Sequence, residues 1–318
     1  MLIETEKNKI DTIVRAKPFI VVGVPAFNEE HTIARVVLEA QKQVDVVIVC
    51  DDGSTDMTAE IAQRLGADVI RHERNLGYGA AIQSLLRRSK ELEADVLVTL
   101  DADGQHEPVE IPSVVKPIIE GTADIVIGSR FFDKRLAYTM PWYRRAGVKI
   151  ITRMVNGSAK NGVSDAQSGF RAYGKRALEK LSIFEDGMGA SVEILLDAAK
   201  NGLMIQEVSS SCKYDNRSTI KTSTHNPVKH LVSVLQSIIR IIIEDKPLTV
   251  LGIPGIFCLS LGTVFGVWML QLYAAKHQIE TNVALASIAF VLIGFFALST
   301  AITLYAISRL AEKTNGKR

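Results

Sequence analysis

Two long apolar stretches near the C-terminus constrain this chain more than any other feature. Residues 248–273 and 283–308 contain no Asp, Glu, Lys, Arg or His. Each stretch is long enough to cross a bilayer, which needs about 20 predominantly apolar residues. The alternative, a pair of core helices in a soluble protein, would leave both helices without the polar face that a surface helix carries. The sequence therefore predicts two transmembrane helices.

The residues around these stretches predict an orientation. The first residues are polar and lack an apolar signal-peptide core, so we expect an integral membrane protein whose large domain stays on the cytoplasmic face. Two spans return the chain to the same side, where a basic tail agrees with the positive-inside rule. The predicted parts are a cytoplasmic domain at 1–225, an amphipathic juxtamembrane helix at 226–247, the two spans within 248–310, and the basic tail at 311–318. For 226–247, a helix packed on the sheet is the alternative.

The N-terminal part alternates short β-rich runs with helical patterns, which predicts βα units around a mostly parallel sheet. Ile33, Val36, Val37 and Ala40 recur at helical spacing. A second helix is predicted over 55–65, closed by Gly66, and a third follows Gly79. Strands are predicted at 19–24, 44–50, 68–71, 95–100 and 124–128.

Polar residues follow three of these strands, at the sheet edge where ligands bind in open parallel sheets. They occupy 25–29, 51–56 and 101–106. Asp101 and Asp103 leave an apolar strand with one residue between them, which suits a Mg²⁺ or Mn²⁺ ion shared with a diphosphate. An isolated Asp-x-Asp can instead cap a turn, so the metal prediction depends on the neighbouring motifs.

Together these motifs resemble the GT-A glycosyltransferases of family 2. The resemblance rests on Pro25, Asn28 and Glu29, on Asp-Asp-Gly-Ser-x-Asp at 51–56, and on Asp-x-Asp-x-Gln-His at 101–106. Gly-Ser-Arg at 128–130 and Asp-Ala-Gln-Ser-Gly-Phe-Arg at 165–171 further resemble the dolichyl-phosphate mannose and glucose synthases. The resemblance covers about residues 18–222. It implies an α/β GT-A domain with a mostly parallel sheet, followed by two transmembrane helices.

The resemblance also implies a nucleotide pocket and a metal site. Asp52 would accept hydrogen bonds from the base or ribose, and His106 is interpreted as orienting its neighbours rather than binding the metal. The metal ligands, for Mg²⁺ or Mn²⁺, would be Asp101, Asp103 and Gln105. The nucleotide-binding residues would be Pro25, Ala26, Asn28, Glu29, Asp52 and Asp101, closed over by Arg217 and Lys221.

Basic residues are candidates for the acceptor site, because a guanidinium donates paired hydrogen bonds to a phosphate. The acceptor phosphate would contact Arg130, Arg145, Arg171 and Ser168, as the resemblance implies. The spacer at 218–220, Ser-Thr-Ile, differs from the Gly-containing segment of the mannose-phosphate synthases.

Asp165 has two conceivable roles. In transferases that act on sugar hydroxyls, a carboxylate removes a proton as the hydroxyl attacks. A phosphate monoester has a second pKa of about 6 and is largely ionised near neutral pH, so it needs no base. With a lipid phosphate as acceptor, Asp165 and Glu193 would organise the sugar and its arginines instead. The predicted catalytic residues are Asp103, Asp165 and Arg130, with the role of Asp165 open.

The resemblance implies metal-dependent, inverting transfer of a sugar from a nucleotide-sugar to dolichyl or another polyprenyl phosphate. UDP-glucose, UDP-N-acetylhexosamine and GDP-mannose are compatible donors, and the segment at 165–171 favours a UDP-sugar. One alternative is a membrane-anchored transferase that extends a glycan or lipid-linked sugar at a hydroxyl. An inactive nucleotide-sugar-binding scaffold is another.

The predicted partners are the nucleotide-sugar, the lipid phosphate and the bilayer. Membrane anchoring and the habit of the family favour a homo-oligomer. A net charge of +2 argues against nucleic acid as a partner.

Overall fold

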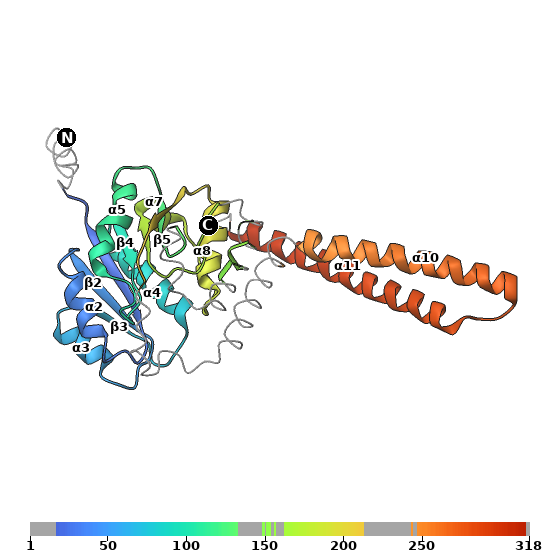
Figure 1. Ribbon diagram of the computed structural model, residues 1–318, viewed down its shortest axis with the longest axis horizontal. Helices are drawn as coiled ribbons and strands as arrows, with labels where there is room; N and C mark the ends of the chain where they lie inside the picture. The colour runs from blue at the N-terminus through green and yellow to red at the C-terminus, as the bar shows by residue number, and fades with distance from the viewer. Residues whose placement is uncertain are drawn as a thin grey trace. The chain divides into compact units, whose positions relative to one another are not determined.

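A computed structural model describes residues 17–132, 148–149, 151–153, 156, 162–212, 243 and 247–315. The chain divides into two compact units between Ser237 and Ile238. The first unit contains the sheet and its helices, and the second contains two long helices (Figure 1).

The first unit is built on a seven-stranded sheet with the order β3-β2-β1-β4-β6-β5-β7. β6 runs antiparallel to both of its neighbours, and the other pairs are parallel, so the predicted mostly parallel α/β sheet is confirmed. All five predicted strands are present, whereas β6 and β7 lie in the half of the domain where no strand is predicted. The strands are β1 (Ile20–Ala26), β2 (Val46–Asp51), β3 (Asp68–Arg71), β4 (Val96–Thr99), β5 (Ile125–Ser129), β6 (Arg171–Gly174) and β7 (Ile205–Ser209).

Helices cover both faces of the sheet, because successive strand residues point to opposite sides and both sides are apolar. Val22 and Val98 belong to one core layer, and their neighbours Val21 and Leu97 belong to the other. The first layer is covered by α2 (Ile33–Ala40), α3 (Thr58–Arg64) and α5 (Ile111–Ile119), which follows a 3-10 turn, η1 (Pro108–Glu110). The second is covered by α4 (Tyr78–Glu91), α7 (Lys175–Lys180) and α8 (Ala190–Lys200).

The topology brings the polar motifs to one edge of the sheet. The parallel strands β1, β2, β4, β5 and β7 all end at this edge. β6 runs the other way, so the turn before Arg171 lies at the same edge, where Arg171 pairs with Thr99 of β4 and Ile127 of β5. Residues separated by more than 100 positions along the chain therefore meet in one place.

The second unit contains the two apolar helices. A π-helical turn, η3 (Leu248–Gly252), leads into α10 (Ile253–Lys276), and α11 (Thr281–Asn315) returns beside it (Figure 1). The apolar segments Leu248–Ala275 and Thr281–Leu310 have mean hydropathies of 2.0 and 2.3, and both are long and apolar enough to cross a membrane. Large apolar side chains such as Phe257, Val264 and Phe296 are exposed on their outer faces.

Small residues let the two helices of this hairpin approach closely. The Ser287 hydroxyl donates to the Gly262 carbonyl over 2.8 Å. A β-carbon placed on Gly262 would lie 2.8 Å from the backbone nitrogen of Val291, and one on Gly294 would lie 2.7 Å from the Gly255 carbonyl oxygen. In lipid the hydrophobic effect contributes little to helix association. Close packing at glycines and interhelical hydrogen bonds are therefore the typical stabilising contacts between helices there.

Candidate active site

The loops after β1 and β2 are locked to each other by side chains. Asn28 has a φ of +55°, a conformation that asparagine tolerates better than most residues. Its backbone N–H donates to the Ser54 hydroxyl over 2.9 Å, and its side-chain oxygen accepts from the Thr55 N–H over 2.9 Å. The Glu29 N–H donates to the Thr58 hydroxyl over 2.8 Å. The turn that carries Asn28 and Glu29 is therefore fixed against the start of α3.

Asp52 is buried and braces the segment that enters α4. One carboxylate oxygen accepts from His72 Nδ1 over 2.7 Å and from the Leu76 N–H over 2.9 Å, and the other accepts from the Gly77 N–H over 2.8 Å. Its own N–H donates to the carbonyl of Ala26, at the end of β1 beside Pro25. Because a carboxylate has about four acceptor positions, the structure leaves Asp52 little capacity for the base or ribose.

Asp51 has no predicted role, and it differs from Asp52 in that one of its carboxylate oxygens accepts no hydrogen bond. Its side chain is fully buried, and Oδ2 accepts no hydrogen bond while lying 3.3 Å from Arg71 Nε. A buried carboxylate oxygen without a hydrogen bond is costly, and the charge of the neighbouring Arg71 guanidinium offsets part of that cost. The signal in the sequence is the paired aspartate of the Asp-Asp-Gly-Ser motif, of which Asp51 is the first.

The expected metal ligands share one loop after β4. The Asp103 carboxylate accepts from the Gln105 N–H over 2.9 Å across Gly104, which has a φ of +70°. Burial and the nearby charge of Asp103 raise the pKa of Asp101 to about 7. A divalent cation would relieve both effects, so these residues fit the predicted site.

Few acidic side chains are available to bind the predicted metal ion. Among residues 17–132, 162–212 and the other described positions, no group of three or more His, Cys, Asp or Glu side chains could hold a metal ion. Asp101 and Asp103 would thus be the only carboxylates of the predicted set, with Gln105 supplying an amide oxygen. Mg²⁺ and Mn²⁺ sites of this kind are completed by phosphate oxygens and water.

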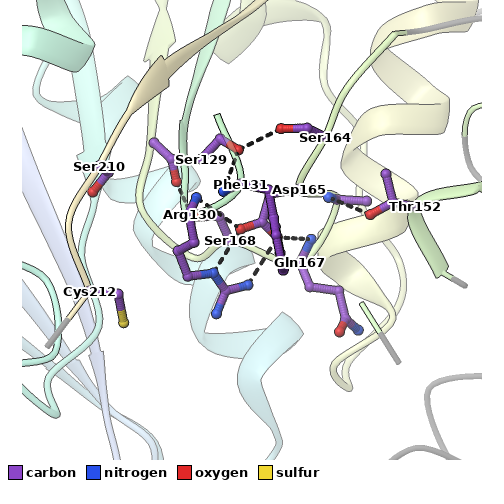
Figure 2. A network of polar contacts seen from close by, with 12 residues as sticks. Ser129, Arg130, Phe131, Thr152, Ser164, Asp165, Gln167, Ser168, Ser210 and Cys212 are labelled. Carbon is purple, nitrogen blue, oxygen red and sulfur yellow. Dashed lines mark hydrogen bonds and ion pairs between the residues drawn. The ribbon is translucent and has the colours of Figure 1, made fainter. Parts of the chain in front are cut away.

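Arg130 and Asp165 form a bidentate ion pair at the centre of the site. Arg130 Nε lies 2.7 Å from Asp165 Oδ2, and Nη2 lies 2.9 Å from Oδ1 (Figure 2). Asp165 is fully buried, and it also accepts from the Gln167 N–H. Burial by itself would raise the pKa of Asp165, but the Arg130 guanidinium outweighs it and holds that pKa below its ordinary value. Asp165 is therefore ionised and oriented toward Arg130.

Arg171 and Ser168, which are expected at the acceptor phosphate, donate their hydrogen bonds to backbone carbonyls in this structure. Arg171 is buried, and its guanidinium donates to the carbonyls of Ser168, Ser191 and Ala166 over 2.8–2.9 Å. The Ser168 hydroxyl is also buried and donates to the Gly128 carbonyl over 2.7 Å. Both residues hold the turn before β6 in shape.

His106 packs behind the metal loop. Its ring stacks on Phe170 with 5.4 Å between centroids, and Nδ1 lies 3.4 Å from the Ser210 hydroxyl. Burial and the charge of Arg130 lower its pKa to about 4, so the ring is neutral. A β-bridge joins His106 to Cys212, which ties the loop to the chain after β7. These contacts hold the His106 ring in a fixed orientation behind the loop.

Three predicted site residues, Arg145, Arg217 and Lys221, lie outside the described residues, as does most of the predicted amphipathic helix at 226–247. Glu193, on α8, accepts from the N–H groups of Phe184 and Glu185, so it shapes the 184–187 loop. Figure 2 shows the part of the site that the structure does bring together, around Arg130, Asp165 and the turn before β6.

Comparison with known proteins agrees with this architecture. The family model described as glycosyl transferase family 2 matches residues 21–182. An uncharacterized protein of Methanocaldococcus jannaschii is 35% identical over 65% of this chain and 86% of its own length. The UDP-N-acetylglucosamine–dolichyl-phosphate N-acetylglucosaminyltransferase of Methanococcus voltae is 36% identical over 61% of this chain and 85% of its own.

The solved structures include glucosyl-3-phosphoglycerate synthase from Mycobacterium tuberculosis in complex with Mn²⁺, UDP and phosphoglyceric acid. It superposes with a TM-score of 0.52 at 22% identity, covering 71% of this chain and 78% of that one, which establishes the shared fold. The sheet, its polar edge and these matches define a glycosyltransferase with a GT-A-like fold. The chain belongs to glycosyl transferase family 2.

Proposed function

We propose that this protein transfers a sugar from a UDP-sugar to the phosphate of dolichyl or another polyprenyl phosphate, with inversion at the anomeric carbon. The observation that carries the proposal is that Asp165 is buried and paired with Arg130, which does not suit a general base. A general base must reach the proton that it removes, and a pKa near the working pH serves it best. Asp165 is instead buried, bound to Arg130 through both oxygens, and lowered in pKa.

An acceptor that needs no base fits such a site. A lipid phosphate is largely a dianion near neutral pH, and its oxygen can attack the anomeric carbon directly. Asp165 holds the Arg130 guanidinium in place, and this positively charged group would donate hydrogen bonds to the acceptor phosphate. Arg145 would join Arg130, as the sequence resemblance implies. A hydroxyl acceptor would need a base that Asp165, in this arrangement, does not supply.

The donor would bind over the ends of β1 and β2. Pro25, Ala26, Asn28 and Glu29 would shape the nucleotide pocket, with Asp51 as an added acceptor for the nucleoside. Asp101, Asp103 and Gln105 would hold Mg²⁺ or Mn²⁺, which stabilises the departing diphosphate when bound. Arg217 and Lys221 would close over the nucleotide, as the resemblance implies.

The relatives support the substrates of this proposal. The Methanococcus voltae relative is named for UDP-N-acetylglucosamine and dolichyl phosphate, and the structural neighbour was crystallised with Mn²⁺ and UDP. We also propose that α10 and α11 anchor the protein in the bilayer with the catalytic unit on the cytoplasmic face. This arrangement would bring the enzyme to a lipid acceptor.

The test is sugar transfer by the detergent-purified chain. Dolichyl phosphate would be offered with UDP-N-acetylglucosamine, UDP-glucose or GDP-mannose, each with Mg²⁺, with Mn²⁺ or with chelator, beside an Asp103→Ala variant. The proposal predicts one sugar phospholipid, made from a UDP-sugar, that disappears with chelator and with the variant. Transfer from GDP-mannose alone would overturn the donor assignment, and metal-independent transfer would overturn the cation site.

A further inference from the structure

Glu207 lies near the middle of β7, and its carboxylate reaches the turn before β6. Its two oxygens accept from the Ser164 N–H over 2.9 and 2.8 Å, and Oε1 also accepts from the Asp165 N–H over 3.0 Å. The side chain thus satisfies two consecutive backbone donors with one carboxylate. Hydrogen bonds to an ionised acceptor are stronger than those to a neutral one, so this contact fixes the turn firmly.

The turn that Glu207 fixes is the one that holds Arg130. Glu207 pairs with Ile127 across β5 and β7, and Arg130 follows β5 at the same sheet edge. Asp165 spans the space between them, with its N–H on Glu207 and its carboxylate on the Arg130 guanidinium. A chain of contacts therefore runs from β7 through Asp165 to the cation of the site.

A carboxylate at this position has an electrostatic cost that a neutral side chain would avoid. The Glu207 carboxylate reaches from β7 to the turn that carries Asp165, so two acidic side chains lie close together, and like charges at close range repel. The repulsion is offset at both carboxylates. Glu207 accepts from the N–H groups of Ser164 and Asp165, and the Asp165 carboxylate accepts from the Arg130 guanidinium. A glutamine has only one acceptor oxygen, so it would turn an NH₂ group toward one of the two backbone donors.

We propose that Glu207 is a positioning residue for the acceptor site, which acts through Asp165 to set the direction of the Arg130 guanidinium. The inference rests on the proposed function, because it takes Arg130 as the contact to the acceptor phosphate. Displacing a positioned group by a fraction of an ångström weakens binding of the group that it faces. Loss of Glu207 should therefore act on the acceptor and leave the donor pocket intact.

The experiment compares Glu207→Gln with the wild type as full chains in detergent, using dolichyl phosphate and the UDP-sugar that the wild type accepts. The expected result is a rise of about tenfold in KM for the acceptor, with KM for the donor within about twofold. Gln206→Ala on the same strand is the matched control, because its side chain donates to the Thr122 carbonyl away from this turn. Equal rises in both KM values would overturn the proposal.

A double-mutant cycle with Arg130→Ala isolates the pathway. If Glu207 acts through Arg130, Glu207→Gln has little further effect on the acceptor KM once Arg130 is gone. If the two fold-changes in the acceptor KM instead multiply, so that their free energies are additive, the proposal is overturned. Binding of UDP with Mn²⁺, measured by calorimetry, reports whether each variant is folded, and Glu207→Asp replaces Glu207→Gln if that variant does not bind UDP.

The two proposals fail in different ways. A wild type that glycosylates only a lipid-linked sugar overturns the phosphate acceptor, and the same cycle is then measured with that acceptor. Additive effects in the cycle overturn the role of Glu207 whichever acceptor is used. Non-additive effects support it in either case.

Discussion

The Asp101 carboxylate lies against the α-carbon of Gly169, so closely that a β-carbon there would be 2.5 Å from Asp101 Oδ2. This contact joins the metal loop to the turn before β6. We expect Gly169→Ala to push Asp101 out of place and to lower sugar transfer by about a hundredfold, since misplacement by about 1 Å can cost that much. Gly162→Ala, which would meet nothing within 4 Å, is the control and should keep full activity. Wild-type activity of Gly169→Ala would contradict the placement of Asp101.

The Arg130–Asp165 pair predicts a pH-dependent stability. Because the pKa of folded Asp165 lies below its unfolded value, the ionised pair stabilises the fold above an unfolded pKa of about 3.9 and loses this effect as pH falls through the folded pKa. Breaking a buried pair costs roughly 3 kcal/mol or more, so Asp165→Asn should lower the melting temperature clearly at pH 7. The gap from wild type should close as the pH falls below about 4.

The control for that measurement is Glu120→Gln, which removes an exposed partner of Lys116. Exposed pairs contribute little, so its melting temperature should stay within about 1 °C of wild type throughout. A gap for Asp165→Asn that stays constant from pH 7 to pH 3 would show that the charge of Asp165 contributes nothing to folding.

The cysteines should differ in reactivity. Cys50 is buried, and burial with the charges of Asp52 and Asp51 raises its pKa to about 12, so its thiolate is scarce at neutral pH. Cys212 is half-buried, and its sulfur lies 3.6 Å from Gln105 Oε1. We expect N-ethylmaleimide to label Cys212 ahead of Cys50 and to inhibit transfer, because the adduct would crowd the metal loop. Peptide mass spectrometry checks the order of labelling. A Cys212→Ser variant that N-ethylmaleimide inhibits as fast as the wild type would contradict inhibition through Cys212.

The apolar hairpin should not accept a large side chain at Gly262. A leucine there would meet the backbone of Val291, which cannot yield as a side chain can. Overpacking costs about 1–3 kcal/mol even where side chains can shift, so Gly262→Leu should lower the thermal stability of the purified protein and its membrane yield. Val264→Leu, at an outward-facing position, is the control and should leave both unchanged.

The sequence is sufficient to predict the part of the sheet that is built from continuous apolar runs. The runs that form β1, β2 and β4 are buried on both faces, and their alternation with helical patterns predicts a mostly parallel sheet. β6 could not be predicted in this way, because it is four residues long and begins with the buried Arg171. Whether a buried arginine is tolerated depends on carbonyls that the fold supplies, and three of them surround this one.

The site shows the same limit. The aspartates at the ends of β2 and β4 can be predicted from their motifs, since the ends of parallel strands meet at one edge. The hydrogen bonds that occupy Asp52 come from His72 and Gly77, which are 20 and 25 residues away, and the ion pair of Asp165 is made with Arg130, 35 residues away. Spacing in a sequence does not report such contacts, so the sequence leaves the role of Asp165 open.

The most direct test of this account is a competition between acceptors. The purified chain would be given its UDP-sugar with equal concentrations of dolichyl phosphate, dolichol and a dolichyl-linked monosaccharide, from pH 5 to pH 8. We predict that dolichyl phosphate alone is glycosylated, with a rate that rises through the second pKa of the phosphate, about 6, and then stays level. Transfer to the lipid-linked monosaccharide in preference to dolichyl phosphate would contradict it and would require a base that the Arg130–Asp165 pair does not provide.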